Sequence, residues 1–362
     1  MAARPDVYRA RKRGKRGFWR TLLVVLLVLI LAAVVLFFSC QKYIVYENNG
    51  LRVEFPIMKG ARSADAAEPT PTIYPAELQY DEPDYSSLLT NAGQGLGILH
   101  GRYITASGVT GDNLNTISKT VSATGVDTLV LQMKPPSGYL SWKSGVVMAD
   151  SFEVNGSEDL SETFMDLAND GVHLIAVVSC CVDSTMADRY EALALRTSDG
   201  SAYTDSNGGW LDPYNSVVRD YISGLCRELA RMGFEEIVLS YLQMPNSSAA
   251  FDFSAELSTT PTPTDAVMSL ARYLRTALSG EGVKVDMVMS PDAILHDYSS
   301  RTGQELSVMS KLCDRLCVFT DSGSIASISE AITNANPDFD MESRLIPFVS
   351  NSQAEGSWVL TN

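Results

Sequence analysis

The sequence predicts an α/β protein, a (β/α)8 TIM barrel preceded by a single transmembrane helix and an extended stalk. Eight short apolar runs alternate with helical patterns over about 265 residues, a length typical of this barrel. The runs are apolar throughout, as expected for parallel strands that are covered on both faces. A doubly wound open sheet is the alternative, although no Gly-x-Gly-x-x-Gly follows the first run to favour nucleotide binding.

The predicted strands are the β-branched apolar runs themselves. In chain order they are 103–106, 127–133, 172–179, 236–241, 283–289, 315–320, 344–349 and 358–361. Apolar residues at helical spacing predict helices over 114–121, 160–167, 213–232, 264–278, 306–312 and 325–332, and several of these segments stop at a glycine. Asp212 before Pro213 is a typical helix start, and Thr302 with Glu305 is a possible capping box.

Residues 21–41 predict a transmembrane helix, because they contain no charged side chain and are long enough to cross the hydrocarbon core. The preceding residues 1–20 carry eight basic side chains, so the positive-inside rule places them in the cytoplasm and everything after 41 outside. The predicted location is therefore the cell membrane, with a single pass. A cleaved signal peptide and lipidation of Cys40 are the alternatives; the apolar run is longer than a typical signal core.

Charge divides the chain into two parts. The whole sequence has 28 Lys and Arg against 43 Asp and Glu, a net charge of −15, and all of the excess acid lies after residue 40. Such an acidic body repels phosphate backbones, so no nucleic-acid partner is expected. Residues 42–97 are acidic and broken by prolines, which predicts an extracytoplasmic stalk before a barrel over 98–362.

The cysteines and histidines predict no metal site and no cofactor. The six cysteines form no pair of Cys-x-x-Cys motifs, and only three histidines are present. Five of the cysteines lie in the outer part, mostly in apolar stretches, which favours buried free thiols over disulfides.

Two linked segments carry a family resemblance. Gly209-Trp-Leu-Asp-Pro-Tyr214 and, after a helix, Gly233-Phe-Glu-Glu-Ile-Val-Leu-Ser-Tyr-Leu-Gln-Met-Pro245 resemble a glycoside hydrolase-like barrel domain of bacterial membrane-anchored or secreted proteins, a relative of amylase-type barrels. Weaker matches extend the resemblance over residues 98–362. It implies a TIM barrel acting on carbohydrate.

The chain departs from the pattern that this family implies. At the end of the second strand, where the family pattern has an acid, this chain has Gln132. After the fourth strand, where the pattern has another acid, it has Ser240. At two nearby positions where the pattern has arginine, this chain has Val177 and Gln243. Glycoside cleavage normally needs two carboxyl groups, and a serine hydroxyl cannot replace the negative charge of one. The expected catalytic apparatus is therefore damaged.

Other carboxylates are candidate replacements. Asp183, Asp292 and Asp321 follow the third, fifth and sixth predicted strands, where a barrel carries its functional loops. These three residues are the catalytic candidates. The alternative is that they cap helices or turns, as loop aspartates often do.

Amide, hydroxyl and aromatic side chains near the same strand ends are candidates for sugar binding, because sugars stack on rings and exchange hydrogen bonds with polar groups. These substrate-binding candidates are Gln132, Tyr139, Trp142, Trp210, Ser240, Tyr241 and Gln243. Packing in the core is the alternative for the rings.

The sequence thus predicts a membrane-anchored barrel that binds or weakly hydrolyses a cell-envelope polysaccharide, with the bilayer contacted through residues 21–41. A scaffolding ectodomain for envelope proteins is the alternative. Two carboxyls ~5–10 Å apart in an open cleft favour hydrolysis. Amides flanked by exposed rings favour binding, and a plugged mouth favours scaffolding.

Overall fold

A computed structural model describes residues 44–47, 50–53, 92–121, 125–254, 260–353 and 355–361. The chain divides into two compact units, residues 1–80 and 81–362. In the first unit, β1 (Ile44–Glu47) and β2 (Gly50–Val53) form an antiparallel hairpin within the predicted stalk. The predicted transmembrane segment 21–41 lies outside the described residues. None of the helices that the structure describes is long and apolar enough to span a bilayer.

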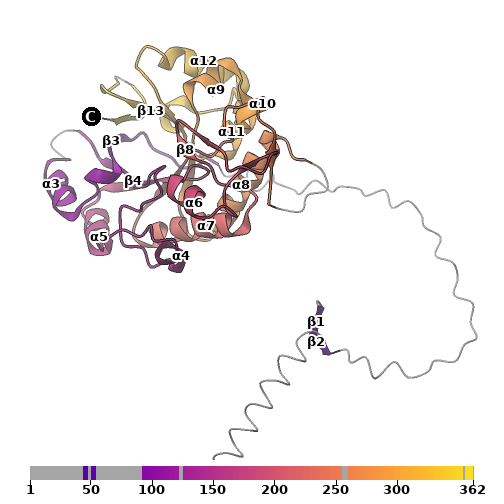
Figure 1. Cartoon of the computed structure of the whole chain (residues 1–362). Coiled ribbons are helices and arrows are strands. Elements are labelled where there is room, and N and C mark those ends of the chain that lie inside the picture. Colours follow the sequence, from indigo (N-terminus) through magenta and orange to yellow (C-terminus); the bar gives the residue numbers. More distant parts are fainter. Residues whose placement is uncertain are drawn as a thin grey trace, which may run out of the picture. The chain divides into compact units, whose positions relative to one another are not determined.

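The second unit is built on a closed barrel of eight parallel strands (Figure 1). They are β3 (His100–Ile104), β4 (Thr128–Lys134), β5 (His173–Ser179), β9 (Glu236–Ser240), β11 (Lys284–Val288), β12 (Leu316–Phe319), β13 (Leu345–Val349) and β14 (Trp358–Leu360). The last strand pairs with the first, Trp358 opposite His100, and this pairing closes the sheet. The predicted barrel is confirmed, and the open-sheet alternative is wrong.

Helices surround the barrel and connect its strands. The longer ones are α3 (Gly111–Val121), α5 (Ser161–Asn169), α7 (Ser216–Arg231), α8 (Pro263–Leu278), α11 (Leu306–Leu312) and α12 (Ile325–Ala335). The shorter ones are η3 (Ala106–Gly108), α4 (Val147–Ser151), α6 (Ser184–Arg189), α9 (Pro291–His296), α10 (Ser299–Thr302) and α13 (Met341–Arg344). Two small antiparallel pairs complete the loops: β6 (Arg196–Thr197) with β10 (Phe251–Asp252), and the hairpin of β7 (Thr204–Asp205) and β8 (Gly208–Gly209).

Two predicted helix starts are wrong. Helix α7 begins at Ser216, where the Asn215 side chain accepts the backbone N–H groups of the first turn. Asp212 instead accepts the N–H of Tyr214 at 2.8 Å, as the first residue of a turn. Glu305 precedes α11 without a side-chain cap, whereas a capping box opens α8 farther upstream.

The barrel interior is filled by side chains from alternate strand positions. Val130, Ile175, Val177 and Val238 belong to the inner cluster, while Leu129 and Leu131 pack outward with the helices. Both faces of the strands are therefore buried, which explains why the runs are continuously apolar.

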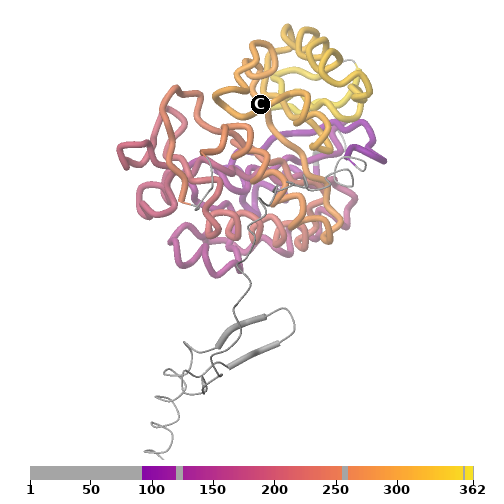
Figure 2. Tube along the Cα trace, turned by 90° about the vertical axis from the view of Figure 1, so that its right-hand side faces the viewer, coloured from indigo at the N-terminus to yellow at the C-terminus, as the bar shows by residue number. Residues whose placement is uncertain are grey.

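The chain enters the barrel at the amino-terminal ends of the strands. The backbone N–H of Gly93 donates to Asp314 at 2.8 Å, and Arg315 donates to the Gly97 carbonyl at 2.9 Å. Figure 2 shows the last strands of the chain, in yellow, beside the first strand of the barrel. The carboxyl ends of the strands, where the connecting loops gather, thus form the opposite face.

Candidate functional site at the barrel mouth

A hollow of about 500 Å³ opens at the carboxyl ends of the strands, and we call it the mouth hollow. Its lining residues are Tyr103, Gln132, Pro136, Val177, Asn207, Ser240, Tyr241, Gln243, Val288, Met289, Ser290, Pro291 and Phe319. Most of them occupy the last positions of strands or the first loop residues after them. Parallel strands bring such positions together at one end, although they are far apart in the sequence.

The four positions that depart from the family pattern all line this hollow. They are Gln132 on β4, Val177 on β5, Ser240 at the end of β9 and Gln243 just after it. Acids were expected at two of these positions and arginines at the other two. Among the described lining residues the hollow therefore has no formally charged side chain.

Several polar groups in the mouth hollow can form hydrogen bonds beyond those that they make to other described residues. The Gln132 Oε1 accepts the backbone N–H of Ala106 at 3.1 Å, which fixes the amide and directs its N–H groups to other acceptors. Within the part of the chain that the structure describes, neither the Ser240 hydroxyl nor the Gln243 side-chain amide has a hydrogen-bond partner. These groups are free to bind a hydroxyl-rich ligand.

Aromatic rings form one side of the mouth hollow. Tyr103 meets Phe319 edge to face at 5.7 Å, and Phe319 lies 4.3 Å from Phe348 between ring centroids. Phe319 is 38% exposed, so part of its ring faces solvent. Burial, with a smaller contribution from the neighbouring Tyr241, raises the pKa of Tyr103 to about 12. The phenol thus remains a hydrogen-bond donor at any physiological pH.

Tyr241 holds a backbone conformation that few residues other than glycine adopt. Its φ is 49°, in the left-handed region, directly after β9. Its carbonyl accepts the N–H of Cys181 at 3.1 Å, which ties the end of β9 to the end of β5. Strain of this kind is concentrated at functional sites, so it is a second observation that favours the mouth hollow as the functional site.

Asp183 was predicted to be catalytic, and the structure corrects this expectation. Its carboxylate is completely buried and lies 2.8 Å from the Lys134 ammonium, which is equally buried. It also accepts the N–H of Met186 at 2.9 Å and so caps α6. The carboxylate has a structural role and no access to the mouth hollow.

Asp292 and Asp321, the other two catalytic candidates, are exposed and lie outside the lining of the mouth hollow. Asp292 lies 3.6 Å from His296 one turn farther along α9. Asp321 accepts hydrogen bonds from Ser324 and from the N–H of Gly323, and these bonds lower its pKa. The structure does not bring either residue together with a second carboxylate in this hollow.

The predicted aromatic binding residues are divided between three places. Tyr241 lines the mouth hollow, and Tyr139 lines a second hollow beside it, described below. Trp142 and Trp210 are fully buried, so the expectation that they contact sugar is corrected. The Trp142 indole donates to Glu228 at 3.1 Å and joins the loop after β4 to α7.

Tyr103, Asn207 and Phe319 are among the lining residues of the mouth hollow that the sequence did not predict. Phe319 lies near the carboxyl end of the predicted strand 315–320, which was an available signal. Tyr103 begins the predicted strand 103–106, and only the observed bounds of β3 place it near a carboxyl end. Asn207 lies in the turn between β7 and β8, a hairpin that no periodicity in the sequence indicated.

The five outer cysteines are buried free thiols, as predicted. Burial raises the pKa of each of them, so they are poor nucleophiles. Within the described ranges no three His, Cys, Asp or Glu side chains are grouped to hold a metal ion.

The closed barrel and its polar mouth place the molecule among the (β/α)8 proteins that carry their sites on loops after the strands. Residues 101–321, more than half of the chain, match the protein family described as "Putative glycosyl hydrolase domain", and the chain belongs to that family. The resemblance stated from the sequence is thereby confirmed.

Several solved structures are similar to this chain. The PgaB (BpsB) glycoside hydrolase domain from Bordetella bronchiseptica is 12% identical and has a TM-score of 0.50, with 70% of this chain and 84% of that chain covered. A hypothetical protein from Ruminiclostridium thermocellum is 22% identical and has a TM-score of 0.45, with 51% and 96% covered. None of the curated proteins compared with this chain matches it.

Proposed function

We propose that this protein is a cell-surface member of the family that binds an envelope polysaccharide at the barrel mouth and lacks an acid pair to cleave it. The observation that carries the proposal is the composition of the mouth hollow. It has uncommitted amide and hydroxyl groups, an aromatic side and, among its described lining residues, no carboxylate.

The substitutions favour an uncharged ligand. Relative to the family pattern, two acids and two arginines are replaced together by Gln132, Val177, Ser240 and Gln243. A carbohydrate needs hydrogen-bonding groups and apolar ring faces rather than charge, and the hollow offers both. A scaffolding role would be favoured by a plugged mouth, whereas this mouth encloses about 500 Å³.

Membrane anchoring through residues 21–41 is part of the same proposal. Residues 93–97 are bonded to the end of the barrel opposite the mouth, so the chain joins the barrel away from the mouth hollow. Membrane fractionation of whole cells, followed by protease treatment of intact cells, tests it. Recovery of the barrel in the cytosol, or its protection from external protease, would contradict the proposal.

A screen of the full-length chain against envelope polysaccharides and defined oligosaccharides tests the binding function. Calorimetry measures binding, and release of reducing ends measures cleavage. We expect binding without cleavage, and we expect Gln132→Ala and Gln243→Ala each to weaken binding by up to about tenfold through lost hydrogen bonds.

Asp292→Asn and Asp321→Asn are the controls, because both carboxylates are exposed and lie outside the hollow. Binding should be unchanged in both. Cleavage by the wild type that either variant abolishes would identify a hydrolase with that carboxylate at its centre. Binding that neither mouth variant weakens would remove the mouth hollow from the proposal.

A further inference from the structure

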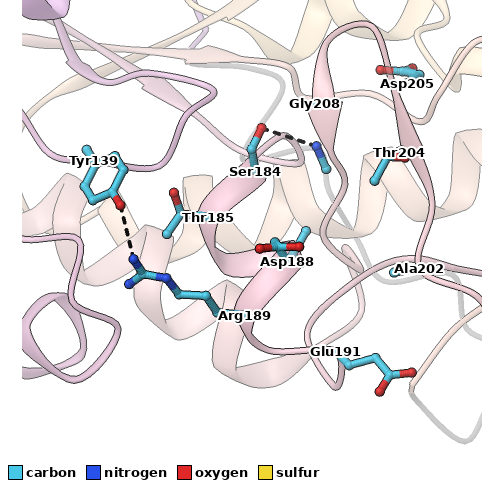
Figure 3. Close-up of a pocket in the computed structure, with 12 residues that line it drawn as sticks. Tyr139, Ser184, Thr185, Asp188, Arg189, Glu191, Ala202, Thr204, Asp205 and Gly208 are labelled. Atoms are coloured by element: carbon cyan, nitrogen blue, oxygen red, sulfur yellow. Dashed lines mark hydrogen bonds between the residues drawn. The ribbon is translucent and has the colours of Figure 1, made fainter.

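A second hollow of about 720 Å³ lies beside the mouth (Figure 3). We call it the side hollow. It is lined by the first turns of α6, by the hairpin of β7 and β8, and by Tyr139 from the loop after β4. None of the residues in its lining belongs to the lining of the mouth hollow.

Two loops border both hollows. In the loop after β4, Pro136 lines the mouth hollow and Tyr139 lines the side hollow, three residues farther along. In the hairpin, Asn207 lines the mouth hollow and the adjacent Gly208 lines the side hollow. The two hollows therefore adjoin at these two loops, and an extended ligand that crosses the loops would contact both hollows.

Hydrogen bonds to the start of α6 hold both loops in place. The N–H of Ser184 donates to the Pro136 carbonyl at 2.9 Å, and the Thr185 hydroxyl donates to the Ser137 carbonyl at 2.7 Å. On the other side, the N–H of Gly209 donates to the Ser184 hydroxyl at 3.3 Å, the bond drawn in Figure 3. The surface between the hollows is therefore preorganised, which lowers the cost of binding a long ligand.

Tyr139 presents a fixed, exposed ring in the side hollow. Tyr139 is 49% exposed and is one of the large hydrophobic residues of the barrel that reach solvent. Arg189 donates to its hydroxyl at 3.2 Å, as Figure 3 shows. Arg189 also donates to the Phe152 carbonyl at 3.3 Å, and these two bonds restrain the ring. A restrained ring with an open face is the group on which a sugar stacks.

The charges of the side hollow restrict the ligand. Asp188, Glu191 and Asp205 contribute three carboxylates to the lining against the single guanidinium of Arg189. The excess negative charge disfavours an anionic polymer such as a polyuronate.

We infer that the side hollow binds further units of the same glycan chain that occupies the mouth, and that the ligand is an uncharged oligosaccharide rather than a single sugar. This inference rests on the proposed function. The adjacency of the two hollows at the two shared loops, together with the Tyr139 ring, carries it.

Calorimetry of the full-length chain with two neutral series tests the inference: β-1,4-linked N-acetylglucosamine oligomers and β-1,4-linked glucose oligomers, each from dimer to hexamer. We expect the affinity for at least one series to rise with length, by about tenfold overall. Tyr139→Ala should abolish this gain, and Tyr139→Phe, which keeps the ring, should restore it. Met165→Ala on α5, at a similarly exposed apolar residue, is the matched control and should match the wild type.

Three outcomes would overturn the inference. One is an affinity that does not change with length, and another is a length-dependent gain that survives Tyr139→Ala. The third is a wild-type chain that binds neither neutral series or prefers an oligogalacturonate of equal length. The proposed function fails separately, only if the broader screen of envelope polysaccharides also finds no ligand.

Discussion

At the scale of single residues, the backbone of Tyr241 provides a test of strain at the mouth. The φ of Tyr241 is 49°, in the left-handed region, where a residue other than glycine costs ~1–2 kcal/mol. Tyr241→Gly and Tyr241→Ala both remove the ring, but only glycine adopts this φ without strain. We expect the glycine variant to be more stable by ~1 kcal/mol. Chemical denaturation measures the difference, and equal stabilities would contradict it.

The partners of Asp183 explain why an aspartate at a strand end is buried rather than open to the mouth. The sequence located it at a strand end, but its exposure depends on Lys134 and Gly138, which come from a different strand and loop. A Cβ on Gly138 would clash with the Asp183 carboxylate, so the loop packs directly on this group and seals it from solvent. Local sequence contains no information about this cover.

At the scale of elements, the buried pair of Lys134 and Asp183 links β4 to α6. Asp183→Asn leaves the buried ammonium without a counter-charge, and we expect it to lose ~3–5 kcal/mol of unfolding free energy. The double variant Lys134→Met/Asp183→Asn removes both charges and should be more stable than Asp183→Asn alone. Urea denaturation of the two variants and the wild type checks this. A double variant that is less stable than the single one would show that the charges do not act as a pair.

At the scale of the whole molecule, ionic contacts at the amino-terminal end join three strands of the barrel. Glu236 of β9 accepts hydrogen bonds from Arg315, next to β12, at 2.8 Å and from His173 of β5 at 2.8 Å. Burial by itself would raise the pKa of Glu236, but these partners outweigh burial and lower it to about 2. Glu236 therefore stays charged at any pH near neutrality.

The pH dependence of stability should follow His173. Burial lowers its pKa, but the hydrogen bond and charge of Glu236, assisted by Glu235, outweigh burial and raise it above 6.5. Its contribution to stability is then complete below pH 6.5 and is lost as the pH rises through the folded-state pKa. The stability advantage of the wild type over His173→Gln should be larger at about pH 5 than at about pH 9. Chemical denaturation of the two proteins at both pH values checks this, and an equal advantage at the two values would contradict it.

The amino-acid pattern alone was enough to predict the barrel. Eight apolar runs alternating with helical patterns specify strands that need cover on both faces, and a closed parallel sheet supplies it. It also located the carboxyl-end residues Gln132, Ser240, Tyr241 and Gln243, because the end of a strand is a local property of the chain. These four residues share one hollow for the same reason.

Which side chains at those strand ends are open to a ligand depends on the packing of distant segments in the folded chain. Trp142 and Tyr139 are three residues apart in one loop, yet α7 covers the first and solvent reaches the second. Asp183 was sealed in the same way, by a glycine turn and a lysine that lie more than forty residues earlier in the chain. Exposure depends on what distant segments pack against a residue, and neither the periodicity nor the composition of the local sequence encodes that packing.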